Sequence, residues 1–442
     1  MEPSRKIVTR IAPSPTGLFH IGTARTALFS WLYAKRNGGE FHIRVEDTDR
    51  ARSKKEYEDN ILAGMEWLGL THDGLVRQSE RVDLHRAALE KLVASGAAYI
   101  SKEEPSEEGK RAEVIRFRNP GGEVSFKDEV RGLITFDVSE LGDFVIAKDM
   151  NDPLYHLAVV VDDIDMNVTH VIRGEDHISN TPRQILLYRA LGVELPTYAH
   201  LPLILAPDRS KMSKRFGATS VDAYREQGYV REAMLNFLGL LGFNPGDDRD
   251  ILSLNELIEC FTLDRIQKGG AIFDVDRLKF FNRHYLRGNS DEYFIDALTA
   301  ADARFADTTA NKTVLATIVR ERVELANDIA TMLENNELNY VVERPTPDAS
   351  KLSWKGQQTS EETRTSLTNS RDALASTSWV TIDEAKAAVW PLAESAGKGQ
   401  TLWPLRVALT GLERSPDPFT VAALLGKDEV IARLDAAIAA CK

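Results

Sequence analysis

The chain has 442 residues, about three times the length of a typical domain of roughly 150 residues, so a single small scaffold is excluded. With 43% hydrophobic and 28% charged residues the composition is that of a globular protein, and no stretch reaches the roughly 18 to 20 apolar residues that a membrane span needs. The net charge of −12 argues against a protein that coats nucleic acid through bulk charge, and the two cysteines, Cys260 and Cys441, supply neither a disulfide framework nor a cysteine zinc site.

The first elements alternate between strand and helix. Residues 6–11 alternate polar and apolar side chains like a strand, and they follow the N-terminus so closely that no secretory signal is expected. Helical spacing predicts a helix over Thr23–Arg36, ended by Gly38, and a second strand follows around Ile43. A capping box at Ser53 is expected to open the next helix. This order predicts a parallel sheet in an α/β protein, and the lack of a secretory signal predicts a cytoplasmic location.

The pattern changes in the region 96–154. Short alternating segments there, such as Val114–Phe117 and Leu133–Phe136, are separated by glycine-containing turns. We interpret this region as an inserted, strand-rich α/β subdomain between two halves of the sheet domain, 1–95 and 155–220. The second half is predicted to contain strands over Leu157–Val161, Val168–Ile172 and Leu201–Leu205 and a helix over Pro182–Leu191.

The rest of the chain is predicted to be helical. Its segments are mostly amphipathic helices, with polar breaks near residues 307–312 and 345–350. We expect a helical domain over 221–290 and an all-α region over 291–442.

One candidate nucleotide-binding segment lies between the first strand and the first helix, where ligands bind in doubly wound sheets. Its His20 can donate to phosphate oxygens, and Gly22 lets a ligand approach the backbone at the helix N-terminus. The alternative is a capped loop with a buried histidine, which for an isolated His-x-Gly sequence is the commoner case.

A second candidate is the basic segment 211–215, with the sequence KMSKR, which follows the last predicted strand. A solvated charged loop is the default interpretation of such a segment. Triphosphate chemistry also favours a basic loop, because lysines can follow the charge that moves onto a leaving pyrophosphate.

Together, the HIGT sequence at 20–23 and the KMSKR sequence at 211–215 resemble the HIGH and KMSKS motifs of class I aminoacyl-tRNA synthetases. Four further segments, distributed nearly from end to end, are similar to bacterial-type glutamyl-tRNA synthetases: 10–17, 44–50, 171–177 and 404–411. The resemblance implies a Rossmann-like α/β catalytic domain, an inserted subdomain that binds the tRNA acceptor end, a helical domain that contacts the tRNA stem and an all-α anticodon-binding region.

The reaction implied by the resemblance is the ATP-dependent ligation of L-glutamate to tRNA(Glu) through a glutamyl adenylate. No protein nucleophile is required, so positioning and electrostatics carry the chemistry. The partners implied are tRNA(Glu), L-glutamate, ATP and Mg²⁺, without zinc and without a protein-held metal, in a cytoplasmic monomer.

The resemblance also assigns a role to particular residues. The catalytic residues are His20, Lys211 and Lys214. The ATP-binding residues are His20, Gly22, Thr23, Lys211, Ser213 and Lys214. The glutamate-binding residues are Arg10, Ser14, Glu46, Tyr155 and Arg173. A guanidinium pairs bidentately with a carboxylate, and a carboxylate suits an ammonium, so Arg10 and Arg173 are assigned to the substrate's side chain and Glu46 to its α-ammonium. Ordinary ion pairs are the alternative for these charged residues.

Other polar residues have plainer interpretations. Asp47 and Asp49 are expected to cap a turn at a strand end rather than to bind metal. The remaining histidines lack metal-binding spacing, although His177 is expected beside the adenylate. Thr23 stands where most class I enzymes have a second histidine, and the inserted region lacks the cysteines that hold zinc in some relatives.

Two other functions stay open at this point. A nucleotidylyltransferase would share the His-x-Gly loop but is usually smaller and lacks a long helical half. A tRNA-binding paralogue without charging activity would keep the fold, although the intact motif residues argue against it.

Overall fold

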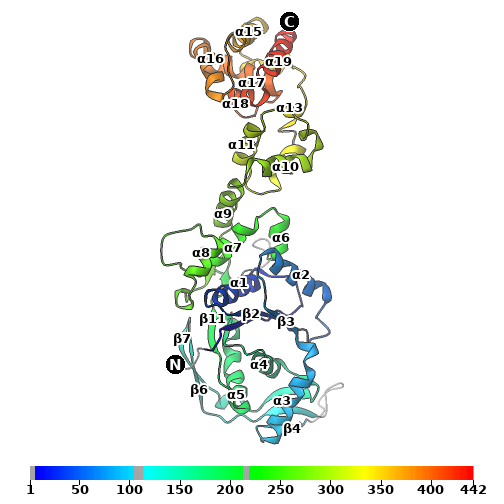
Figure 1. The fold of residues 1–442 in the computed structure, drawn as a ribbon, viewed down its shortest axis with the longest axis vertical. Helices are drawn as coiled ribbons and strands as arrows, with labels where there is room; N and C mark the ends of the chain where they lie inside the picture. The colour runs from blue at the N-terminus through cyan, green and yellow to red at the C-terminus, as the bar shows by residue number, and fades with distance from the viewer. Residues whose placement is uncertain (1–4, 104–112, 211, 213–218, 442) are drawn as a thin grey trace. The chain divides into compact units, whose positions relative to one another are not determined.

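The computed structural model describes the following parts of the chain: residues 5–103, 113–210, 212 and 219–441 (Figure 1). Within these ranges, no helix combines the length and apolar character that spanning a bilayer requires. The chain forms two compact units, Met1–Phe281 and Asn282–Lys442, which are described in turn.

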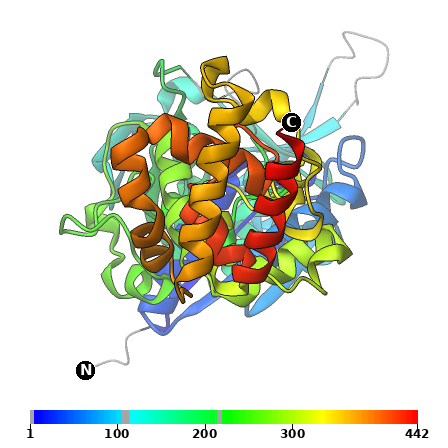
Figure 2. The same ribbon diagram turned by 90° about the horizontal axis from the view of Figure 1, so that it is seen from above.

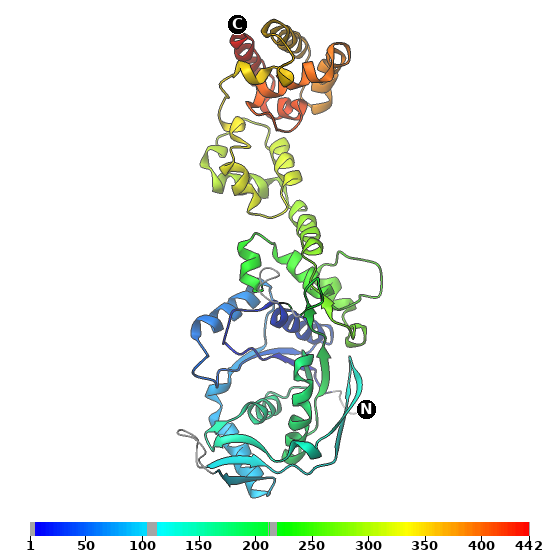
Figure 3. The ribbon, with the colours of Figure 1, turned by 180° about the vertical axis from the view of Figure 1, so that it is seen from behind.

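The first unit is built on a seven-stranded sheet with the strand order β3-β2-β1-β10-β11-β6-β7. The strands are β1 (Val8–Ile11), β2 (Glu40–Val45), β3 (Gly74–Arg77), β6 (Glu123–Asp128), β7 (Gly132–Asp137), β10 (His170–Gly174) and β11 (Thr197–Leu201). Neighbours from β3 to β6 are parallel, and the β6–β7 hairpin at the edge is antiparallel (Figure 3). Every residue of β1 is buried, as expected for a central strand of a sheet covered on both faces. The predicted α/β sheet is confirmed.

The helix after β1 begins inside the predicted nucleotide-binding segment. Helix α1 spans Ile21–Arg36, two residues longer at its start than predicted, and His20 is its N-cap. The ring Nδ1 of His20 accepts a hydrogen bond of 3.1 Å from the backbone N–H of Gly22. Gly38 follows the helix with a φ of +62°, so the predicted left-handed stop is confirmed. The HIGT sequence therefore forms the first turn of α1.

The strand predicted over Leu157–Val161 is wrong, because this segment lies within a helix, α4 (Tyr155–Asp165). A short, continuous apolar run fits a buried strand or a buried helix equally well by periodicity. Here α4 packs against α3 (Val82–Ala94), α5 (Thr181–Leu191) and β8 (Phe144–Asp149), so it is enclosed and needs no polar face (Figure 1).

The capping box predicted at Ser53 is also wrong. Helix α2 spans Lys55–Trp67, its N-cap is Lys54, and the Ser53 hydroxyl has no hydrogen-bond partner among the described residues. The backbone N–H of Lys54 donates to the carbonyl of Pro15 over 3.0 Å. This bond holds Lys54 in an extended conformation and starts the helix one residue later.

The strand predicted over Leu201–Leu205 is divided. Strand β11 ends at Leu201, and the short β12 (Ile204–Leu205) pairs with β13 (Ala271–Ile272) in a separate sheet. Pro202 lies at the break, and because it has no backbone N–H it cannot continue the ladder of β11.

The inserted region divides between two sheets. Four of its strands form an antiparallel sheet: β4 (Ala98–Lys102), β5 (Glu113–Phe117), β8 (Phe144–Asp149) and β9 (Asp152–Pro153). The β6–β7 hairpin instead joins the main sheet, where Asp128 is the register partner of Tyr198 on β11. The strand-rich character predicted for this region is confirmed, and part of it extends the seven-stranded sheet.

Four further helices complete the first unit and enter the second: α6 (Val221–Glu226), α7 (Arg231–Leu240), α8 (Leu254–Cys260) and α9 (Val275–Arg287). The division between the two units falls within α9. The domain boundaries expected at 220/221 and 290/291 stay predictions.

In the second unit, every regular element that the structure describes is helical. Its α-helices are α10 (Asp291–Ala301), α11 (Lys312–Arg322), α12 (Asp328–Glu334), α13 (Asn339–Val342), α14 (Ala349–Leu352), α15 (Ser360–Ser376), α16 (Ile382–Ala396), α17 (Lys398–Thr410), α18 (Pro418–Leu425) and α19 (Lys427–Ala440). Helices α15 and α19 run side by side (Figure 2). The predicted polar breaks lie at the starts of α11 and α14. Because every regular element described in this region is helical, the all-α prediction is confirmed.

Candidate active site

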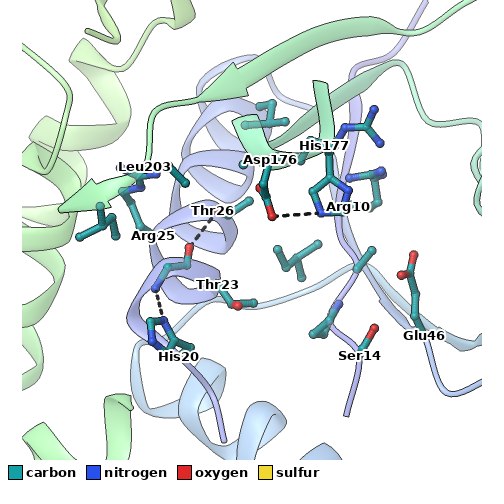
Figure 4. A pocket seen from close by; sticks show the side chains of 18 of the residues that line it. Arg10, Ser14, His20, Thr23, Arg25, Thr26, Glu46, Asp176, His177 and Leu203 are labelled. Carbon is teal, nitrogen blue, oxygen red and sulfur yellow. Dashed lines mark hydrogen bonds and ion pairs between the residues drawn. The ribbon is translucent and has the colours of Figure 1, made fainter. Parts of the chain in front are cut away.

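A pocket of about 470 Å³ opens at the carboxyl ends of β1 and β10, the edge where doubly wound sheets bind ligands (Figure 4). Its lining residues come from the segments 10–14, 20–26, 172–177 and 202–204 and from Glu46, Tyr155 and Met212. In the close-up, Arg10, Ser14 and Glu46 lie at one side of the pocket, and His20 and Arg25 lie at the other.

The pocket gathers all the predicted site residues that the structure describes: Arg10, Ser14, His20, Gly22, Thr23, Glu46, Tyr155 and Arg173. Lys211, Ser213 and Lys214 lie outside the described residues. Their neighbour Met212 is described, and it lines the same pocket. Met212 of the KMSKR sequence therefore lies in the same pocket as residues of the HIGT sequence, although the two are far apart in the chain.

At the side with His20, the N-terminus of α1 faces the pocket. The N–H of Gly22 donates to Nδ1 of His20, so Nδ1 is the acceptor and the neutral ring carries its proton on Nε2. The side chain of Thr26 donates to the carbonyl of Gly22. A donating imidazole beside the positive end of a helix dipole suits a phosphate ligand.

Arg25, on the same helix, was not predicted. It is almost fully buried and lies in the lining, and its guanidinium donates to the carbonyls of Pro202 and Leu241. Burial lowers the pKa of Arg25 to about 10, with a smaller opposing effect from Glu175. Arg25 ties α1 to the loop after β11 and so fixes one wall of the pocket.

At the other side, Arg10 belongs to a buried ionic cluster. Its Nε and Nη2 donate to the two oxygens of Asp163 over 3.0 and 3.3 Å. Arg44 donates to both Asp163 and Glu46. Burial would raise the pKa of Asp163, but the guanidinium groups of Arg10 and Arg44 outweigh it and hold that pKa below its ordinary value. Burial raises the pKa of Glu46 despite the attraction of Arg44.

Arg173, on β10, has different partners. Its Nε donates to Nε2 of His200 over 3.1 Å and its Nη2 donates to the hydroxyl of Thr181 over 2.9 Å. It forms no ion pair with a described carboxylate, although it is only 6% exposed. Burial accordingly lowers the pKa of Arg173 from its ordinary value. A buried cation without a counter-ion is costly, so this position favours an anionic ligand.

Two further side chains, Tyr155 and His177, line the same pocket as the arginines. The hydroxyl of Tyr155, at the start of α4, forms a hydrogen bond of 2.9 Å with Nδ1 of His177. Burial, assisted by the charge of Arg173, lowers the pKa of His177 to about 4, so this ring is neutral at pH 7. Its other nitrogen lies 3.9 Å from the carboxylate of Asp176. His177 lines the pocket, but its contact with an adenylate stays a prediction.

The two aspartates after β2 have the following partners. Asp47 accepts from the N–H and hydroxyl of Ser79, and Asp49 accepts from the N–H and Nε of Arg52. The bond from the N–H of Arg52 is the expected local cap at Asp49, whereas Asp47 bridges to another segment. Among the described residues there is no group of three or more His, Cys, Asp or Glu side chains arranged to hold a metal.

A second cavity, of about 1080 Å³, adjoins the pocket and shares Ser14, Glu46 and Tyr155 with it. Its other walls include the segment 48–52, part of α3 and the segment 148–154 of the inserted region. The pocket is therefore continuous with a larger space lined by the insert.

Asp163 and His200 are functional candidates that the sequence analysis did not assign to the site. For Asp163 a signal existed, because it follows Tyr155 by eight residues and would share its face once the segment is recognised as a helix. For His200 no signal pointed to its partner Asp128, because Asp128 lies on β6, a strand that the order of the chain does not place beside β11.

Comparisons with known proteins identify the family of the chain. Residues 6–113 and 102–280 match the family of class I tRNA synthetases for E and Q, catalytic domain, and residues 283–438 match an anticodon binding domain. The chain is 41% identical over 470 residues to a glutamate–tRNA ligase of Nitratidesulfovibrio vulgaris and 38% identical over 481 residues to one of Desulforamulus reducens; in each case 98% of this chain and 99% of the relative are covered. A crystal structure of a glutamate tRNA ligase from Elizabethkingia meningosepticum, in complex with its amino acid, aligns with a TM-score of 0.86 at 30% identity and covers 99% of this chain and 100% of that chain.

Proposed function

This chain belongs to the class I tRNA synthetases for glutamate and glutamine, and we propose that it ligates L-glutamate to tRNA(Glu) with ATP. The observation that carries the choice of amino acid is the environment of Arg173, a buried cation without a carboxylate partner among the described residues, in the same pocket as Glu46. In the first step an α-carboxylate oxygen attacks the α-phosphorus of ATP and pyrophosphate leaves. In the second step the terminal adenosine of tRNA takes the acyl group and AMP leaves.

We propose that the side of the pocket with His20 binds ATP. The Nε2–H of His20 and the N-terminus of α1 would donate to phosphate oxygens, and Gly22 and Thr23 would line the nucleotide's path. Lys211 and Lys214 are proposed to neutralise the charge on pyrophosphate as it leaves, and Ser213 is proposed to bind ATP. This assignment rests on their motif and on the position of Met212.

The opposite side is proposed to bind glutamate. Glu46 would accept from the α-ammonium, Arg10 and Arg173 would donate to the side-chain carboxylate, and Tyr155 and Ser14 would complete the walls. The support is charge complementarity, since one end offers a carboxylate and the other offers guanidinium groups.

Mg²⁺ is proposed to enter as part of the ATP substrate. In the lining, Glu46 is paired with Arg44 and Asp176 lies beside His177, so these carboxylates form no dedicated oxygen cage. A cation held mainly by phosphate oxygens and water fits such a lining. When bound it would neutralise phosphate charge. Zinc independence, a monomeric state and a cytoplasmic location complete the proposal.

We propose that the adjoining cavity receives the acceptor end of tRNA. It opens directly onto Glu46 and Tyr155, so an adenosine entering it would approach the activated carboxyl group. The second unit, which matches an anticodon binding domain, would bind the far end of the tRNA. The two relatives described above match both units over nearly their full length, and both are named glutamate–tRNA ligases. They support neither open alternative, a nucleotidylyltransferase or a paralogue without charging activity.

A charging assay with purified tRNA isoacceptors tests the proposal. We expect ATP-dependent attachment of glutamate to tRNA(Glu). A paralogue without activity would bind tRNA and leave it uncharged, whereas a nucleotidylyltransferase would leave tRNA uncharged and would release pyrophosphate only as it transferred AMP to an acceptor other than glutamate. Including tRNA(Gln) decides whether this isoacceptor is also charged.

A further inference from the structure

The two arginines assigned to the substrate's carboxylate differ in how the protein balances their charge. Arg10 has a counter-ion, which it shares with Arg44, because both oxygens of Asp163 accept from it. Arg173 has none among the described residues; its partners are an imidazole nitrogen and a hydroxyl. A neutral ligand could accept a hydrogen bond from either arginine, but only an anion would balance the charge of Arg173.

The protonation state of His200 follows from its neighbours. A guanidinium nitrogen is always a donor, so Nε2 of His200 must accept from Arg173. The opposite nitrogen, Nδ1, lies 2.6 Å from Oδ2 of Asp128 and donates to it. A proton added to Nε2 would face the N–H of Arg173. His200 is therefore neutral, and burial accordingly lowers the pKa of its ring, against the opposing effect of Asp128.

Asp128 makes this arrangement stable without contacting Arg173. Its carboxylate accepts from the backbone N–H groups of Val130, Arg131 and His200 as well as from the imidazole. Burial would raise the pKa of Asp128, but these bonds, led by that from His200, hold it below its ordinary value. The negative charge thus stays on the far side of the imidazole ring from the guanidinium.

We propose that His200 is a positioning residue for specificity: as a neutral acceptor it orients Arg173 and leaves the guanidinium charge to be balanced by a side-chain carboxylate of the substrate. This inference rests on the proposed role of Arg173 in binding glutamate. A carboxylate at position 200 would orient Arg173 equally well but would balance its charge inside the protein. The preference for glutamate over glutamine would then be lost.

The test relocates one charge. In the double variant Asp128→Asn with His200→Glu the carboxylate moves into contact with Arg173, and the total charge of the buried group is unchanged. The matched control, Asp128→Asn with His200→Gln, has nearly the same shape and no carboxylate. Because both are buried substitutions, thermal unfolding and the KM for ATP are measured on each.

For the charge-relocated variant we expect kcat/KM for glutamate to fall by roughly 10², the scale for losing one charge-assisted hydrogen bond, and the preference over glutamine to fall with it. The control is expected to keep that preference within about tenfold. Equal preferences in the two variants would overturn the proposal, because a merely structural role of His200 predicts that both change alike.

A measurement on the unmodified protein covers the case in which the variants do not fold. Nitrogen-15 spectra of histidine-labelled protein, with His200 assigned from the spectrum of His200→Gln alone, are expected to show a neutral ring with its proton on Nδ1 at pH 7. An imidazolium at that position would refute the inference. Normal glutamate binding by Arg173→Ala would instead refute the underlying assignment of Arg173, so the two failures are distinguishable.

Discussion

Arg10 and Asp163 form a two-bond ion pair in which both side chains are almost completely buried. Asp163 also accepts from Arg44, which in turn holds Glu46. One carboxylate on α4 thus fixes residues at both ends of the proposed glutamate site. The site is assembled through this helix rather than by the strands alone.

Replacing Asp163 by asparagine should destabilise the protein strongly, because two buried guanidinium groups lose their shared counter-ion. We expect a loss of about 3 to 5 kcal/mol in the free energy of unfolding, measured by denaturant titration. Asp165→Asn is the matched control, since this side chain is 47% exposed and pairs with Arg81 at the surface. Its expected cost is about 0 to 1 kcal/mol, and similar costs for the two variants would contradict the role of Asp163.

Arg173→Ala should raise the KM for glutamate by on the order of 10² and narrow the advantage over glutamine, because a charge-assisted partner of the substrate is removed. The KM for ATP should stay near its original value. Arg189→Ala, on the exposed side of α5, serves as the control. If Arg173→Ala keeps its preference and loses ATP affinity instead, Arg173 belongs to the nucleotide end of the pocket.

Lys214→Ala should slow adenylate formation by roughly 10² to 10³ and leave the Kd for ATP little changed. The reason is that a cation following the leaving pyrophosphate acts mainly in the transition state. Single-turnover kinetics and equilibrium ATP binding separate the two effects, with exposed Lys268→Ala as the control. A normal single-turnover rate in Lys214→Ala would show that Lys214 does not take part in catalysis.

The stability of the first unit should fall as the pH is lowered from about 6.5 to about 4. Burial, with smaller effects from Arg183 and Arg173, lowers the pKa of His156 from 6.5 to about 4 in the folded protein. Between these values the unfolded chain binds more protons than the folded one, so unfolding becomes easier as the pH falls. His156→Phe should flatten this dependence, and His72→Gln, at an exposed position, should not. The free energy of unfolding is measured by chemical denaturation across this pH range. The expectation is contradicted if His156→Phe does not change the slope of this free energy against pH.

The residues that line the pocket were predicted from the sequence more accurately than the helices and strands around them. Motifs near His20 and Arg173 place residues at strand ends, and strand ends of a parallel sheet meet, so their convergence followed from local patterns. The helix α4 could not be distinguished from a strand, because its enclosure by three neighbours removes the polar face on which periodicity depends. The partnership of Asp128 with His200 depends on the pairing of β6 with β11, which local patterns do not encode.

Because β6 of the inserted region pairs with β11 of the main sheet, the inserted region cannot be removed without changing the main sheet. A shortened protein in which a tight turn replaced residues 119–143 would turn β11 into an edge strand, with its backbone groups open to pairing with another chain. It would also leave the Nδ1–H of a buried imidazole without an acceptor. Such a protein should aggregate, even though every residue that lines the pocket is retained.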